Sequence, residues 1–276
     1  MKLGLNGATT MKASLWTDIA AAKAAGFPLL EIWAAKLDEA VRDRGIREVG
    51  KALDAAGVRP WAINSIEHIS FRTPADERGI RDRCEQLAGY ARELGCPNLV
   101  VVPGFAPAGA SFATVVDESC RILADLSDLA SPDVGLAFEF IGGQGLSVGS
   151  LAECRAVVER CDRPNVGLVI DSFHFHAGGS SLPDFEGLDP ARVFIFHIND
   201  AEDLPRADQR DCHRLLPGLG ILPLPGLLSR FKAIGYDGVV SIEIFRPEYW
   251  DRDPVDLAKA CRASMERVIQ AAGFAV

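Results

Sequence analysis

The chain has 276 residues and a formal net charge of −9, which argues against a surface built to bind nucleic-acid phosphates or an anionic membrane. Hydrophobic residues make up 48% of the chain and charged residues 24%, so it has enough apolar material for a large core and is not a disordered segment. The expected partner is therefore a small molecule, with neither nucleic acid nor membrane.

The seven cysteines form no CxxC pair, and their odd number prevents complete pairing within the chain. This usage indicates reduced thiols and a cytoplasmic protein. The opening residues MKLGLNGATT lack the long apolar core of a signal peptide, and no apolar run approaches the roughly 18 residues of a membrane-spanning helix. We therefore expect a cytoplasmic location, and a homodimer is compatible with everything in the sequence.

Short apolar segments alternate with longer helical segments along the chain. Each apolar segment has the length and composition of a strand buried in a parallel sheet. The predicted strands are Lys2–Asn6, Pro28–Trp33, Val58–Asn64, Pro97–Pro103, Val134–Phe140, Asn165–Asp171, Arg192–Asn199 and Gly238–Ile244. The predicted helices are about Ser14–Ala25, Asp38–Ala56, Ala75–Leu94, Phe112–Ala130, Ser150–Cys161, Leu224–Ile234 and Pro254–Ala272. A long loop is expected after Asp171.

Eight strands alternating with helices predict a closed parallel (β/α)8 TIM barrel of the α/β class. Such a barrel takes about 250 residues, and no linker or low-complexity stretch divides residues 1–276, so a single TIM-barrel domain is expected. The alternative is an open doubly wound sheet. It would need a GxGxxG loop after the first strand, where Asn6 to Thr9 read NGAT instead.

Four consecutive predicted strands end in an ionisable residue embedded in apolar sequence. These residues are Glu139 in AFEFI, Asp171 in VIDSF, His197 in IFHIN and Glu243 in SIEIF. Because the active site of a TIM barrel is built from the C-terminal ends of the strands, the four side chains are expected to meet at one mouth. One of them alone could be a paired core group, but four buried charges without partners are costly.

Three carboxylates that face one barrel mouth repel each other and shift toward protonation unless a cation lies among them. A divalent metal ion resolves this conflict, and a purely structural charge cluster is the alternative. Three carboxylates and one imidazole form a hard donor set. The expected cofactor is therefore one divalent ion, Mn2+, Mg2+, Co2+ or Zn2+.

Three long stretches carry a resemblance to a known family. They are NVGLVIDSFHFHAGGS from Asn165, FIFHINDAEDLP from Phe194 and SIEIFRPEYW from Ser241, joined by the shorter LNGATT from Leu5. On these stretches the chain resembles the xylose-isomerase-like barrel superfamily of sugar isomerases and epimerases. Within it, the chain is similar to the 2-keto-myo-inositol (inosose) isomerases of inositol catabolism. The resemblance covers nearly the whole chain.

The resemblance implies a role for each candidate residue. In that superfamily one divalent metal is held by the residues that match Glu139, Asp171, His197 and Glu243. The two glutamates double as catalytic acid and base groups, while His174 and Arg214 match residues that contact substrate. The epimerases carry a further glutamate where this chain has Gly145, which disfavours epimerase-type contacts to a hydroxyl.

The expected reaction moves a carbonyl along a cyclic or linear polyol by proton transfer through an enediolate. One of Glu139 and Glu243 would remove the proton next to the carbonyl, and the same or the other glutamate would deliver it to the neighbouring carbon. A ketose 3-epimerase, a hydroxypyruvate isomerase or a dehydratase would use the same site. Two more distant alternatives are a non-catalytic sugar- or metal-binding barrel and a phosphodiesterase resembling the AP endonucleases. Five histidines and a net charge of −9 disfavour the phosphodiesterase.

Several other residues are weaker candidates. His176 is expected to bond to the backbone in preference to substrate, and His68 to lie on the surface. Glu31 could orient a substrate hydroxyl or support a metal-binding histidine. Trp33 is expected to form an apolar wall for the substrate, and Trp61 to fill the barrel. Asn6 and Asn64 end the first and third strands, where their amides could bind hydroxyls. Arg246 could bind substrate or neutralise the surroundings of Glu243.

Overall fold

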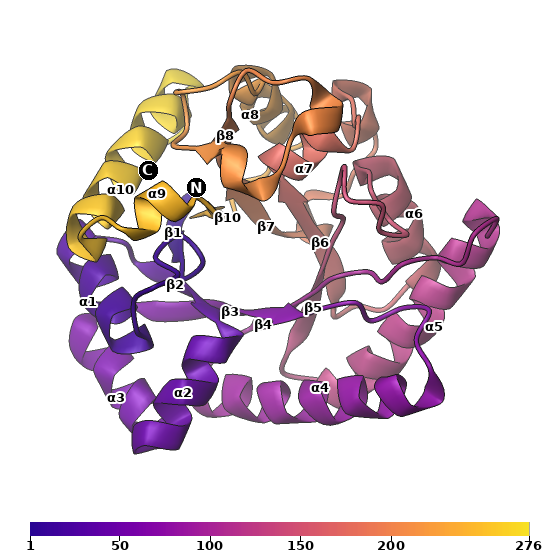
Figure 1. Ribbon diagram of the computed structural model, residues 1–276, viewed down its shortest axis with the longest axis horizontal. Coiled ribbons are helices and arrows are strands. Elements are labelled where there is room, and N and C mark those ends of the chain that lie inside the picture. The colour runs from indigo at the N-terminus through magenta and orange to yellow at the C-terminus, as the bar shows by residue number, and fades with distance from the viewer. Residues whose placement is uncertain (276) are drawn as a thin grey trace.

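The centre of the structure, a computed structural model that describes residues 1–275, is a closed barrel of eight parallel strands (Figure 1). The strands are β1 (Lys2–Asn6), β2 (Leu29–Trp33), β3 (Arg59–Ile66), β4 (Asn98–Val101), β5 (Gly135–Glu139), β6 (Val166–Asp171), β7 (Val193–Ile198) and β10 (Val239–Ile242). Around the barrel they follow the order β1, β10, β7, β6, β5, β4, β3, β2. Each predicted strand coincides with one of these, so the predicted TIM barrel is confirmed.

Side chains along each strand alternate between the inside of the barrel and the surrounding helices. The interior is filled by a small apolar cluster, which consists of Ala62, Val100, Val102, Ala137, Val169 and Ile195. In β5 Ala137 faces inward and Phe138 packs outward, so the next residue, Glu139, faces inward again. The same alternation turns Asp171 of β6 and His197 of β7 toward the barrel axis.

Helices form an outer ring around the strands (Figure 1). They are α1 (Leu15–Ala25), α2 (Ala34–Arg44), α3 (Ile46–Ala56), α4 (Pro74–Leu94), α5 (Phe112–Ala130), α6 (Leu151–Cys161), α8 (Leu224–Ala233) and α10 (Pro254–Ala271). Polar caps begin several of them. Ser14, for example, accepts a hydrogen bond from the backbone amide of Thr17 in the first turn of α1. Within residues 1–275, no helix is long and apolar enough to cross a membrane.

Two predictions about the connections were wrong. The single helix expected at Asp38–Ala56 is two helices, because Gly45 has a φ of 85° that ends α2 and turns the chain into α3. The connection after β6 was expected to be a loop, but it begins with the short helix α7 (Ser172–Ala177). Asp171 starts that helix, since its carboxylate accepts a hydrogen bond from the backbone amide of His174 at 2.8 Å.

A buried ion pair shapes the loop between β1 and α1. The Lys36 ammonium donates to the Asp18 carboxylate at 2.8 Å and also to two backbone carbonyls of the loop, again at 2.8 Å. The same loop carries Thr9, whose hydroxyl bonds to the backbone on both sides of Glu243. The ion pair therefore supports the position of a residue at the barrel mouth, far from it in the sequence.

Removing the cation of this pair should destabilise the protein. The substitution Lys36→Met leaves the Asp18 carboxylate buried without its partner, at an expected cost of about 3–5 kcal/mol in the free energy of unfolding at pH 7. Burial raises the pKa of Asp18 to about 6 even beside Lys36. Protonation of Asp18 removes its buried charge. The free energy of unfolding of the variant should therefore rise again as the pH falls through the raised pKa of Asp18. Urea denaturation at several pH values measures both effects.

The double variant Asp18→Asn, Lys36→Met is the control for this experiment. It removes both charges, so it should recover most of the stability lost in the single variant at pH 7. A single variant as stable as the wild type at pH 7 would show that the pair does not support the loop.

Candidate metal centre

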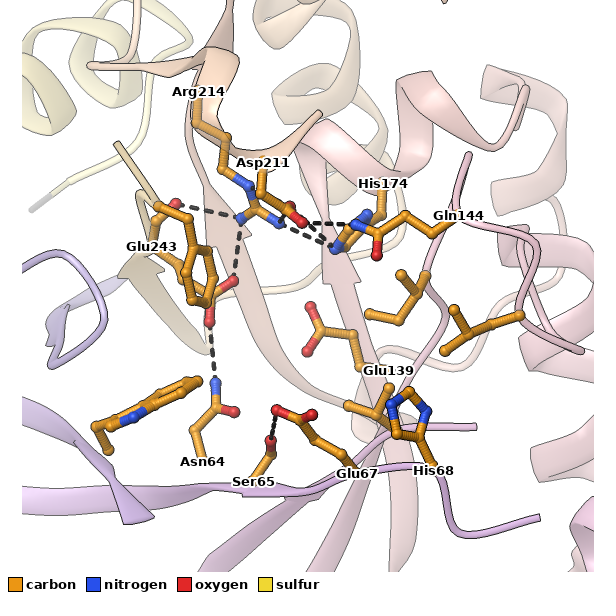
Figure 2. A pocket seen from close by; sticks show the side chains of 15 residues that line it. Asn64, Ser65, Glu67, His68, Glu139, Gln144, His174, Asp211, Arg214 and Glu243 are labelled. Atoms are coloured by element: carbon orange, nitrogen blue, oxygen red, sulfur yellow. Dashed lines mark hydrogen bonds and ion pairs between the residues drawn. The ribbon is translucent and has the colours of Figure 1, made fainter. Parts of the chain in front are cut away.

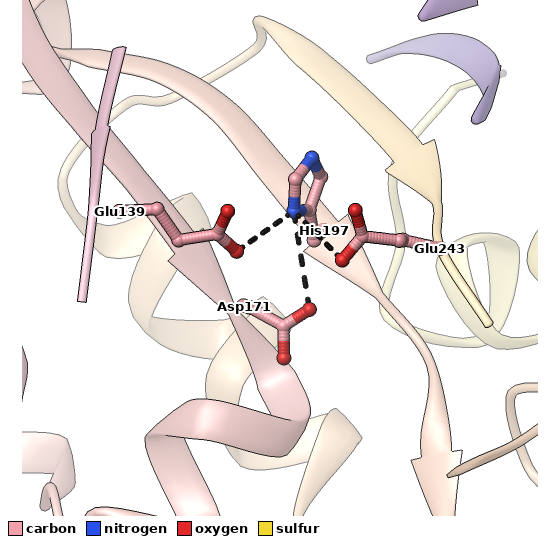
Figure 3. Close-up of side chains that lie close together, drawn as sticks. All are labelled: Glu139, Asp171, His197 and Glu243. Atoms are coloured by element: carbon pink, nitrogen blue, oxygen red, sulfur yellow. Dashed lines mark hydrogen bonds and ion pairs between the residues drawn. The ribbon is translucent and has the colours of Figure 1, made fainter. Parts of the chain in front are cut away.

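Four ionisable side chains converge at the C-terminal mouth of the barrel (Figure 3). They come from the ends of β5, β6 and β7 and from the residue after β10, and they are Glu139, Asp171, His197 and Glu243. One potential ligand atom from each lies within 4.8 Å of those of the others. None of the four is more than 3% exposed. The structure thus brings together all four residues predicted from the ends of successive strands.

The imidazole of His197 lies at the middle of this cluster. Its Nδ1 is 3.0 Å from Glu139 Oε1, 3.4 Å from Glu243 Oε2 and 3.9 Å from Asp171 Oδ2. The opposite nitrogen, Nε2, lies 3.0 and 3.1 Å from the two carboxylate oxygens of Glu31. A carboxylate at Nε2 holds the proton there in the neutral imidazole, which leaves the Nδ1 lone pair facing the cluster as a ligand.

The cluster holds more negative charge than the protein itself balances. Burial alone would lower the pKa of His197, but the carboxylates of Glu243, Glu31 and Glu139 outweigh it and hold this pKa well above its ordinary value. Burial raises the pKa of Glu243 to about 8, with the neighbouring Glu139 adding to the rise. His197 and Glu243 thus bind protons more tightly than usual, and a cation placed among the four side chains would be stabilised by the same negative charge. Three carboxylates and one imidazole fit a single divalent ion.

Side-chain amides fix the carboxylates of the cluster from behind. Asn6 and Asn64 donate to Glu243 Oε1 at 3.0 and 2.9 Å. Asn199 donates to Asp171 Oδ2 at 3.0 Å. The sequence makes the amides of Asn6 and Asn64 candidates for binding substrate hydroxyls, and in the structure both donate to Glu243. Neutral donors of this kind hold a carboxylate in place without supplying the charge that a metal ion would supply.

Arg214 is the one permanent cation in contact with this cluster among the described residues. It lies in a two-stranded sheet after β7, formed by β8 (Asp200–Ala201) and β9 (Arg214–Leu215). Nη1 of Arg214 donates to Asp171 Oδ2 at 2.8 Å and to Glu243 Oε2 at 3.0 Å. The guanidinium carbon lies 4.9 and 5.2 Å from the ring centroids of Phe173 and Phe245. Two aromatic rings and two carboxylates therefore fix this buried side chain.

A second set of contacts ties Arg214 to the cavity wall. Its Nη2 lies 2.9 Å from Nε2 of His174, and its Nε and Nη2 both donate to Asp211 Oδ1. Because a guanidinium can only donate, His174 accepts through Nε2 and carries its proton on Nδ1. Asp211 also accepts from the Gln144 amide at 2.5 Å. These contacts join the loops after β5 and β7 above the cluster (Figure 2).

A cavity of about 250 Å3 opens above the four converging side chains. It is small beside typical ligand pockets of roughly 300–1,000 Å3, and this size suits a single sugar-sized ring. The residues lining it are Trp33, Asn64, Ser65, Glu67, His68, Val102, Glu139, Ile141, Gln144, Leu146, His174, Asp211, Arg214, Glu243 and Phe245. Figure 2 shows the polar members on both sides of Glu139 and Glu243.

Comparison with known proteins places this site in a family. The sequence profile of the xylose isomerase-like TIM barrel family matches residues 19–268. The chain belongs to this family. The inosose isomerase of Bacillus licheniformis is 35% identical over 98% of each chain. The inosose isomerase of Bacillus velezensis is 33% identical over 98% of this chain and 97% of the relative.

A solved structure agrees with this fold throughout. The crystal structure of the IolI protein, which contains a bound zinc atom, superimposes with a TM-score of 0.96 at 31% sequence identity. The match covers 100% of both chains. A protein of almost the same fold therefore contains a bound metal.

The structure decides several of the weaker predictions for this family member. Glu31 bonds to His197 and supports the candidate ligand, which is the second of its two predicted roles. Trp33 lines the cavity as predicted, whereas Trp61 lies outside the lining and donates to a backbone carbonyl. His176 and Arg246 are likewise outside the lining, and Arg246 pairs with Glu202 and Glu248 instead.

The expectation that His68 lies on the surface was wrong. It is half-buried, lines the cavity and stacks on Phe105 with ring centroids 5.3 Å apart. Three further cavity residues were not predicted from the sequence. They are Asp211, Gln144 and Glu67, from the segments after β7, β5 and β3. Loop residues follow no period of 2 or 3.6, so only proximity in sequence to Arg214 could have drawn attention to Asp211.

Metal affinity should depend strongly on pH. A metal ion must displace the protons that the cluster attracts, so binding weakens as the pH falls. Because the pKa of Glu243 is raised to about 8 and that of His197 is also raised, Mn2+ affinity should rise between about pH 6 and 8. The expected slope is about tenfold per pH unit for each proton displaced. Calorimetry in buffers of different ionisation enthalpy measures affinity and proton release together. Equal affinities at pH 6 and 8 would contradict this account.

The contact between Glu31 and His197 should also be measurable through the metal. The substitution Glu31→Gln removes the charge that orients the imidazole, so Mn2+ affinity should fall by about 10- to 100-fold. Glu67→Gln is a matched control, because Glu67 lines the same cavity and has no hydrogen bond or ion pair with the four converging residues. If the two variants bound Mn2+ equally well, Glu31 would have no role in orienting the histidine.

Proposed function

We propose that the protein is a divalent-metal-dependent isomerase that moves a carbonyl between neighbouring carbons of inosose (2-keto-myo-inositol). The observation that carries the proposal is the convergence of three carboxylates and one imidazole at the floor of a cavity sized for one ring. The relatives with matches over almost the whole chain support inosose as the substrate. The homodimer and the cytoplasmic location stay predictions of the sequence.

The four converging residues would hold the metal. Glu139, Asp171 and Glu243 each offer a carboxylate oxygen, and His197 offers Nδ1. This set accepts Mn2+, Mg2+, Co2+ or Zn2+. A divalent ion bound there supplies Lewis-acid chemistry, since it stabilises the negative charge that develops on the carbonyl oxygen during proton transfer.

The two glutamates differ in their freedom to act as a base. Both carboxylate oxygens of Glu243 accept hydrogen bonds, from Asn6 and Asn64 on one side and from Arg214 on the other. Glu139 is held through Oε1 only, and its Oε2 meets no donor within residues 1–275. We therefore assign removal of the proton next to the carbonyl to Glu139, and reprotonation of the neighbouring carbon to either glutamate.

Arg214 would position the substrate in concert with His174. All its hydrogen-bonding groups are engaged, and Nη1 is engaged with two of the proposed metal ligands. Nη1 of Arg214 would become available to a substrate oxygen only when the carboxylates of Asp171 and Glu243 engage a metal ion instead. His174 accepts from Nη2 and so keeps the guanidinium plane fixed while Nη1 changes partner. Fixing the reacting carbon near its base in this way lowers the entropic part of the barrier.

A direct assay tests the proposed function. Purified protein loaded with Mn2+ should convert inosose, lose this activity when a chelator removes the metal, and regain it when Mn2+ is returned. Tagatose, fructose and hydroxypyruvate are tested in parallel, because the same site chemistry serves the alternative activities. The proposal fails if the metal-loaded protein does not convert inosose, and turnover of one of the other three substrates alone would show an alternative activity at the same site.

The role of Glu139 can be separated from metal binding. An amide cannot accept the proton, so Glu139→Gln should lower kcat by about 100- to 10,000-fold. It should also stop exchange of the substrate α-proton with D2O, which NMR detects without turnover. Metal content is measured on the same sample, so that lost exchange with metal retained identifies the base. His176→Gln is the control, since His176 lies outside the cavity lining. Wild-type exchange rates in Glu139→Gln would move the assignment to Glu243.

A further inference from the structure

Apolar residues line the cavity on two opposite sides of the barrel. Trp33 ends β2 and Phe245 follows β10, the two strands that flank β1, and their rings meet edge to face at 5.7 Å. Val102, Ile141 and Leu146 come from the segments after β4 and β5. Since β5 stands four strands from β1 in either direction around the barrel, these aliphatic side chains oppose the aromatic pair. The cavity therefore has two facing apolar walls.

Polar residues occupy the two remaining sides. Arg214 and Asp211 come from the segment after β7, and His174 comes from the one after β6. Glu67 and His68 follow from β3, which stands four strands from β7. Figure 2 shows the two groups facing each other, with Glu139 and Glu243 between them. Around the mouth, the lining thus alternates apolar, polar, apolar and polar.

This pattern matches the chemistry of one kind of polyol. In a six-membered ring with equatorial hydroxyls, the two faces present C–H groups and the rim presents all the oxygens. Such a ring, standing on edge between the apolar walls, would meet polar groups along its whole rim. An extended open-chain polyol presents hydroxyls in several directions and would place some of them against the apolar walls without partners, which is unfavourable.

Glu67 and His68, which form one polar side of the cavity, take no part in the proposed proton transfer or metal binding. The Glu67 carboxylate is exposed and has only a long contact, 3.5 Å, with the Ser65 hydroxyl. Neither ring nitrogen of His68 bonds to another group of the described chain, and Nδ1 is buried, which leaves Nε2 for a ligand. The backbone of His68 has a φ of 55°, a conformation that few residues other than glycine adopt. The Phe105 ring stacks on the imidazole and helps to hold it.

We propose that Glu67 and His68 bind the hydroxyls on the rim of the ring farthest from the reacting carbons. They thereby make the site select a ring-closed polyol with equatorial hydroxyls over open-chain ketoses. This inference rests on the proposed function, because it concerns the same site, and it assigns specificity to two residues that the reaction itself does not use. The carboxylate accepts from the hydroxyls, and the imidazole can donate or accept.

Binding of unreactive polyols tests the inference without turnover. The probes are scyllo-inositol, a ring with only equatorial hydroxyls, and sorbitol, an open chain with the same number of carbons. Calorimetry on the Mn2+-loaded wild type should show scyllo-inositol binding at least about tenfold more tightly than sorbitol. His68→Ala and Glu67→Gln should each weaken scyllo-inositol binding by about tenfold and change sorbitol binding by less than about twofold. Equal binding of the two polyols by the wild type, or unchanged scyllo-inositol binding in both variants, overturns the inference.

Kinetics on inosose separate this inference from the proposed function. Hydroxyl contacts made equally in the bound substrate and the transition state affect KM, so His68→Ala should raise KM by about tenfold with little change in kcat. An inosose that lacks the rim hydroxyl opposite the reacting carbons should have a higher KM than inosose with the wild type. His68→Ala should raise the KM of this analogue little further, because the contact is already lost. His176→Gln is the matched histidine control and should behave as the wild type does. Absence of inosose turnover by the wild type would contradict the proposed function. The roles of Glu67 and His68 would then be tested by the binding of scyllo-inositol and sorbitol alone.

Discussion

Repulsion among buried carboxylates is the constraint on which the rest of the site depends. Glu31, Glu139, Asp171 and Glu243 lie within one small region of the barrel mouth, none of them more than 3% exposed. Carboxylates removed from water in this way are stable only with hydrogen-bond donors, bound protons or a cation. The structure supplies the first through side-chain amides and the second through the raised pKa of Glu243 and of the central His197. Arg214 supplies part of the third, and a divalent ion held by the four converging residues would supply the rest.

The barrel makes this concentration of charge possible. Each strand turns alternate side chains inward, so an apolar residue one step below the mouth fixes the direction of the ionisable residue above it. Val169 below Asp171 and Ile195 below His197 are examples. The packed interior cluster thus fixes the positions of the ionisable side chains directly above it. Other cavity residues, such as Glu67, Gln144 and Asp211, lie beyond the barrel strands, so much of the cavity wall belongs to a different layer of the fold from the four converging residues.

This separation explains what the sequence could and could not predict. Strands buried in a parallel barrel are apolar runs, so an ionisable residue at the end of such a run is conspicuous, and all four predicted ligands do converge. Asp211 and His68 lie in irregular segments where no period reveals direction, and their place in the cavity depends on how distant loops meet. The break at Gly45 was missed for a similar reason, because a glycine inside a helical pattern can be tolerated or can end the helix.

Arg214 connects the two layers. Its guanidinium bonds to Asp171 and Glu243 in the floor and to His174 and Asp211 in the walls. Its ion pairs with the carboxylates of Asp171 and Glu243 offset part of the negative charge of the cluster. Nη1 is occupied by two of the carboxylates that would hold a metal ion, and it would be free for a substrate oxygen only where the metal drew them away. On the proposed function, binding of substrate through Arg214 would therefore depend on binding of the metal.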